Sequence, residues 1–164
     1  MNSAAHAAHH HHHSHHQETA PSLNRLAVTA TLHCLSGCAI GEVLGLVIAT
    51  SLGWTNTASI ALAVLLAFVF GYGFTLAPLM RGGMTFAAAA SVAFGADTAS
   101  IAVMEIVDNA TMLVIPDALE AGVTGGLFWA SLALSFVVAF VVTVPVNRWL
   151  IARGRGHAVA HAHH

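Results

Sequence analysis

The segment from residue 84 to 115 is long and apolar enough to cross a bilayer as a helix, yet it contains three acidic residues. At about 100° per residue, the three acids fall on one face of that helix. This face comprises Asp97, Ile101, Met104, Glu105, Asp108 and Met112. An acidic side chain at the bilayer centre costs roughly 2.5–3.5 kcal/mol, so these carboxyls need protons, cations, partners or water inside a protein. The alternative is that they lie near helix ends and cap neighbouring helices.

The composition of the whole chain also indicates an integral membrane protein. Of its 164 residues, 57% are hydrophobic and only 7% are charged, whereas about 25% of the residues in soluble domains are charged. Lysine is absent, and the five basic residues are all arginines. The formal net charge of −2 and the lack of a basic cluster exclude a nucleic-acid-binding protein.

Four apolar segments divide the central part of the chain, residues 25–152. They span approximately residues 26–52, 58–79, 84–115 and 127–146. Short connections between them favour an all-α, integral membrane four-helix bundle. All five arginines flank the ends of these segments on one side, so the positive-inside rule predicts that both termini are cytoplasmic.

Histidine-rich arms flank the four segments. Residues 1–24 contain eight of the thirteen histidines, and residues 153–164 end in a similar run. The arms lack core-forming residues, so we expect the first to be disordered. The alternative is an expression tag, but the interruption by Ser14 and the surrounding Ala/His repeats favour a native arm that binds transition metals with little selectivity.

The first apolar segment carries two adjoining stripes of small or polar residues. Cys34, Cys38 and Glu42 are spaced four apart, which places them on one face of a helix. The second stripe consists of Gly37, Gly41 and Gly45. Because glycines let helix backbones approach closely, we expect this ridge to bring the first helix against the third, where both polar faces would be hidden. The second and fourth segments are mainly Ala, Leu, Val and Phe, and we interpret them as packing scaffold.

The soft side chains of the first and third segments form a candidate metal site. Cys34 and Cys38 lie on adjacent helical turns and would supply two thiolates to one ion, with help from His33 or Met104. Such ligands favour Cu(I) or Zn²⁺ over Na⁺ or Ca²⁺, and copper is the leading candidate. The carboxyls that would balance charge or carry coupled protons are Glu42, Asp97, Glu105 and Asp108. The alternative is that both cysteines are small buried hydrophobic residues.

Three blocks of the sequence resemble a known family. HCLSGCAIGE (33–42), ADTASIAVMEIVDN (96–109) and PVNRWLIARGRGHA (145–158) are similar to the signature blocks of small bacterial multi-pass membrane proteins catalogued as a domain of unknown function. The resemblance covers residues of about 28–161. It implies a four-span domain in the bacterial plasma membrane and an association with copper-handling proteins.

Three classes of function follow from these observations. The favoured interpretation is that the chain binds or translocates a soft transition metal. The alternatives are a carrier of protons or cations on the intramembrane carboxyls and a structural subunit of a larger membrane complex. The lipid bilayer is the expected partner in each case, with a metal ion or a membrane-complex subunit as a further one. We do not expect an enzyme, because the sequence has no nucleophile triad, phosphate loop or redox motif.

Overall fold

The computed structural model describes residues 22–153, which form four consecutive α-helices and no strands. The helices are α1 (Leu23–Ser51), α2 (Asn56–Arg81), α3 (Phe86–Val114) and α4 (Gly126–Ala152). The predicted all-α class and the number of helices are confirmed for this part of the chain. The histidine-rich arms lie almost entirely outside the described residues.

Local sequence signals explain where several helices begin and end. The hydroxyl oxygens of Ser22, Thr55 and Thr85 each accept a hydrogen bond from the backbone N–H three residues further on, which satisfies one donor of the first helical turn. The third helix ends where Ile115 adopts an extended conformation. Its successor is Pro116, and the residue before a proline is disfavoured in helical geometry.

The distribution of side chains is the reverse of that in a soluble bundle. Large apolar side chains face outwards, including Phe94, Ile106 and Val141, which are 66%, 69% and 62% exposed. The carboxyls, by contrast, are at most 5% exposed: Glu42, Asp97, Glu105 and Asp108. Each helix is also long and apolar enough to cross a bilayer. These features indicate a multi-pass membrane protein whose acids lie inside the bundle rather than at helix ends.

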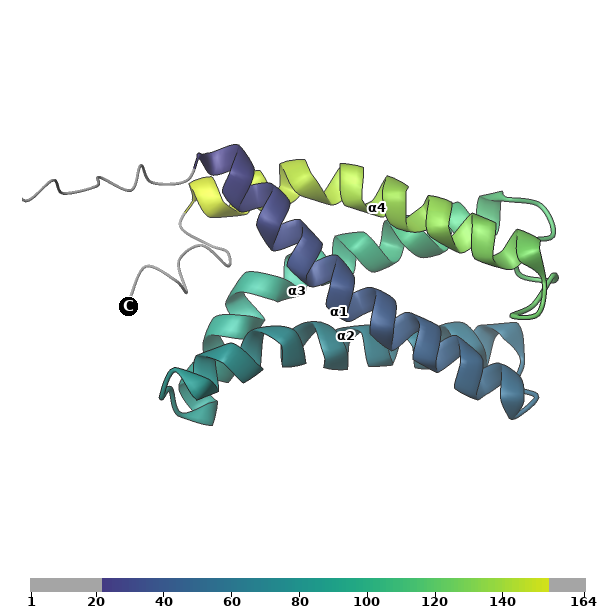
Figure 1. Cartoon of the computed structure of the whole chain (residues 1–164), viewed down its shortest axis with the longest axis horizontal. Coiled ribbons are helices and arrows are strands. Elements are labelled where there is room, and N and C mark those ends of the chain that lie inside the picture. Colours follow the sequence, from purple (N-terminus) through teal and green to yellow (C-terminus); the bar gives the residue numbers. More distant parts are fainter. Residues whose placement is uncertain (1–21, 154–164) are drawn as a thin grey trace, which may run out of the picture.

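The helices alternate in direction, which gives the bundle two distinct ends (Figure 1). The start of α1, the α2–α3 turn and the end of α4 lie at one end, here called the terminal end. The α1–α2 turn and the α3–α4 connection lie at the other, the loop end. The first helix contacts all three others, including α3, whereas no contact joins α2 to α4 within the described residues. The polar helices α1 and α3 are therefore the pair that meets in the interior.

The glycine ridge of α1 packs against α2, and the prediction that it faces α3 is wrong. A Cβ atom on Gly45 would lie 2.5 Å from the Ala63 Cα, and one on Gly41 would collide with the backbone carbonyl of Leu66. The second helix presents a matching stripe of small residues, Ser59, Ala63, Ala67, Gly71 and Thr75. Gly37 and Gly41 each precede a residue of the polar stripe by one position, a rotation of about 100°, so the two stripes face different neighbours.

Replacing Gly41 by alanine should destabilise the bundle by about 1–3 kcal/mol, because the added methyl group has no space beside the α2 backbone. Chemical denaturation in detergent micelles measures the change. The matched control is Gly73→Ala, since a Cβ at Gly73 meets no atom within 4 Å. That change should be neutral or stabilise α2 by about 0.5–1 kcal/mol through helix propensity. Equal effects of the two substitutions would contradict the close approach of α1 and α2.

Candidate functional site

A cluster of carboxyl groups lies where α1 meets α3. The side chains of Glu42 and Asp108 are within hydrogen-bonding reach of each other, and Glu105 lies close enough to interact with both. Ser135 of α4 donates a hydrogen bond to Oδ1 of Asp108. We call Glu42, Glu105 and Asp108 the carboxyl cluster.

The carboxyl cluster retains unused hydrogen-bonding capacity. Among the described residues, one buried oxygen of each member has no hydrogen-bond partner: Glu42 Oε2, Glu105 Oε2 and Asp108 Oδ2. Two ionised carboxylates cannot hydrogen-bond to each other, and unpaired charges inside a membrane are costly. The arrangement therefore requires protons or cations to neutralise it.

A sulfur cluster adjoins the carboxyl cluster on its terminal side. Cys34, Cys38 and Met104 belong to one buried group that also contains Ile101. The Cys38 thiol is within hydrogen-bonding reach of both Cys34 and Glu105, and both cysteines are free thiols. Polar groups consequently continue from the carboxyl cluster towards the terminal end.

The predicted metal ligands are only partly brought together. Cys34, Cys38 and Met104 share the sulfur cluster, but the ring of His33 lies edge-on against Phe74 of α2, with centroids 5.7 Å apart. In residues 22–153, no group of three or more His, Cys, Asp or Glu side chains is arranged to hold a metal ion. The assignment of copper to these residues therefore stays a prediction.

Near the terminal end, Asn147 joins three helices. Its Nδ2 donates to Oγ1 of Thr31 on α1 at 2.8 Å, and its Oδ1 accepts a hydrogen bond from Ser100 on α3. All three side chains are at most 5% exposed. We call Thr31, Ser100 and Asn147 the polar clamp, because its hydrogen bonds hold α1, α3 and α4 together.

Asp97 is separated from the carboxyl cluster. It is 1% exposed and lies eight residues before Glu105, which places it about 12 Å away along the axis of α3. Ser100 of the polar clamp is only one turn from it along the same helix. The polar face of α3 thus contributes Glu105 and Asp108 to the carboxyl cluster, and Asp97 and Ser100 at a second level nearer the terminal end.

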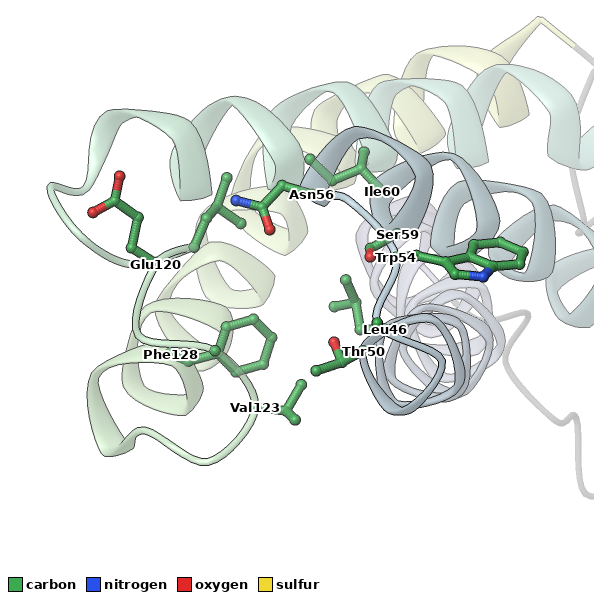
Figure 2. Close-up of a pocket in the computed structure, with 12 residues that line it drawn as sticks. Leu46, Thr50, Trp54, Asn56, Ser59, Ile60, Glu120, Val123 and Phe128 are labelled. Carbon is green, nitrogen blue, oxygen red and sulfur yellow. The ribbon is translucent and has the colours of Figure 1, made fainter.

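At the loop end, α1, α2, the start of α4 and the two connections line a cavity of about 490 Å³, here called the vestibule. Figure 2 shows Phe128, Val123 and Leu46 directed towards its centre, whereas Glu120 and the Trp54 ring point away. A much smaller cavity of about 10 Å³ lies beside Glu42 and shares lining residues with the vestibule. The cavity beside Glu42 thus adjoins a larger hollow at the loop end.

Residues 24–156 match a protein family described as a domain of unknown function, DUF4396. The chain belongs to this family. The match covers all four helices and agrees with the family resemblance of the sequence. No curated protein and no solved structure gives a significant match. The DUF4396 description assigns no activity to the domain.

The interpretation of the fourth helix of this DUF4396 protein as plain scaffold is wrong. Ser135 bonds to the carboxyl cluster, and Asn147 holds the polar clamp. The signal was present in the spacing, because polar residues recur at multiples of four along α4: Ser131, Ser135, Thr143 and Asn147. These four side chains are all buried. Serine and threonine hydroxyls contribute little to hydropathy contrast, and Asn147 lies just beyond the apolar segment of about 127–146, so the stripe is easily overlooked.

Replacing Asn147 by alanine should lower the free energy of unfolding by about 1–3 kcal/mol, because Thr31 and Ser100 lose their interhelical partner in a buried setting. Denaturation in detergent micelles tests this. Asn109→Ala is the control, since in residues 22–153 the hydrogen bond of Asn109 Nδ2 stays within its own helix and goes to the Glu105 carbonyl at 2.9 Å. If Asn109→Ala were as damaging as Asn147→Ala, the interhelical role of the clamp would be refuted.

Proposed function

We propose that this DUF4396 protein carries protons across the membrane on its carboxyl cluster. The supporting observation is that Glu42, Glu105 and Asp108 each hold a buried carboxyl oxygen without a hydrogen-bond partner among the described residues. Intramembrane acids that face a bundle interior are typical of proton and ion pathways. Burying these acids costs free energy, and a helix that served only for packing would have no use for them.

The neighbours of the carboxyl cluster favour protons as its cargo. Glu42 is within hydrogen-bonding reach of Asp108, Glu105 is within reach of Cys38, and Glu105 and Asp108 interact through their charges. Each of the three carboxyls can bind and release a proton. Proton transfer needs only such hydrogen-bonding distances, whereas a bound metal ion needs several ligands in one coordination sphere. The positive-inside rule supports placing the terminal end in the cytoplasm of a bacterial cell, with the vestibule outside.

Replacing Glu42 by glutamine or Asp108 by asparagine should slow proton uptake by about 10²-fold or more, because an amide keeps the shape but no longer transfers a proton. Proteoliposomes that contain a pH-sensitive dye and are challenged with a pH gradient and valinomycin measure the rate. Asp117→Asn is the control, because Asp117 is exposed in the α3–α4 connection and its positive φ of 60° suits asparagine. Unchanged flux in both cluster variants would refute the proposal.

Binding of a soft metal is the second candidate function. Its support is the sulfur cluster, in which Cys34, Cys38 and Met104 are buried together. Two thiolates and a thioether suit Cu(I), which accepts few ligands. In this alternative, Asp97 and Glu105 would balance charge or accept the protons that the thiols release.

Replacing Cys34 and Cys38 together by serine should remove one equivalent of copper from the full chain, measured by anaerobic Cu(I) titration against a competing chelator. The histidine-rich arms are retained in both proteins, so the difference between them reports the core alone. Asp97→Asn is the control and should leave the stoichiometry unchanged. Equal copper binding by the double variant and the parent would refute a cysteine site. If the cysteine and carboxyl variants were all silent, the structural-subunit hypothesis would lead.

A further inference from the structure

Two cavities at the loop end lie in series. The vestibule, of about 490 Å³, and the inner cavity, of about 10 Å³, are both lined by Leu46, Ile60 and Leu119. Only the inner cavity is also lined by Glu42 and by two residues of α3, Asn109 and Met112. The three shared side chains therefore separate the vestibule from the carboxyl cluster.

The inner cavity has the size and chemistry to hold one water molecule. A buried water needs about 10–15 Å³ of such space and two or more polar partners. Glu42 is 4% exposed, and its Oε2 has no hydrogen-bond partner within the described part of the chain. Asn109 also lines the cavity and is a second residue there with a polar side chain.

We infer that the vestibule is the route by which water brings protons to Glu42, and that Leu46, Ile60 and Leu119 form its hydrophobic gate. The inference deepens the proton-carrier proposal by assigning the side from which the carboxyl cluster is reached. Apolar constrictions of this kind stop ions by excluding water, and they conduct when they become hydrated. A single water in the inner cavity would complete the hydrogen-bonded path from the gate to Glu42.

The two ends of the bundle support this direction of access. At the terminal end, the hydrogen bonds of Asn147 to Thr31 and Ser100 tie three helices together. At the loop end, the groups between the vestibule and Glu42 are apolar side chains without interhelical hydrogen bonds to break. The carboxyl cluster is consequently more accessible from the loop end than through the polar clamp.

Substituted cysteines in the full chain test the route with a small charged methanethiosulfonate, applied to right-side-out and inverted membrane vesicles. Leu46→Cys should react from the loop side, because Leu46 lines the vestibule. Leu52→Cys, at the exposed loop end, and Gly82→Cys, at the exposed terminal end, identify the two sides. The native chain, whose cysteines are buried, gives the background.

Ile48→Cys is the matched control for depth, because Ile48 lies half a turn further along α1 with its side chain 43% exposed on the apolar surface. It should not react, since a thiolate does not form in hydrocarbon. If Leu46→Cys reacted no faster than Ile48→Cys, or reacted only from the side of Gly82→Cys, the inferred route would be overturned.

A second arm tests the gate. Met112→Cys places the reporter thiol in the inner cavity, and adding Leu119→Ala should accelerate its modification by at least about tenfold, because the shortened side chain leaves the gate hydrated. Adding Leu65→Ala, on the lipid-facing side of α2, should have no effect. Equal rates with Leu119→Ala and Leu65→Ala would overturn the gate. Labelling does not require transport, so a reactive Leu46→Cys in a protein without proton flux would refute the proposed function and leave the route intact.

Discussion

The cost of placing a carboxyl group in hydrocarbon governs the arrangement of this bundle. Four acids lie within the two helices α1 and α3, and all four are buried. Only the interior of the bundle can shield them from lipid, so these two helices must meet across it. The contact between α1 and α3 and the separation of α2 from α4 in the described residues both follow from that requirement.

The first helix meets this requirement by dividing its buried surface between two kinds of contact. Its glycine ridge allows a backbone-to-backbone approach to α2, where Gly37 and Gly71 are among the residues that touch. Its polar stripe then faces α3, and Glu42 reaches Asp108. Lipid tails are as apolar as the side chains, so moving apolar surface from lipid into a contact between helices brings no hydrophobic gain. Close packing of small residues therefore has to supply the stability that a hydrophobic core supplies in water.

The sequence predicts the helices and the polar faces well, because both depend on patterns within one segment. The length of each apolar run, the four-residue spacing of Cys34, Cys38 and Glu42, and the helix end before Pro116 are local properties. The helix that packs against the glycine ridge cannot be predicted from one segment. The ridge can pack against any stripe of small residues, and both α2 and α3 carry such a stripe. The polar role of α4 was missed because Ser135 and Asn147 matter only through residues far away in the sequence, Asp108 and Thr31.

A vestibule filled with water, as inferred above, would also change how the transmembrane voltage is distributed over the protein. Where water penetrates to Leu46, the transmembrane voltage falls mainly over the remaining protein, and Glu42 and Thr31 are separated along α1 by about 16 Å. Moving one elementary charge through the whole potential takes about 2.3 kcal/mol per 100 mV. A proton that reaches Glu42 from the loop end would cross only a small part of this field, and most of the electrical work would fall on the step between Glu42 and the polar clamp.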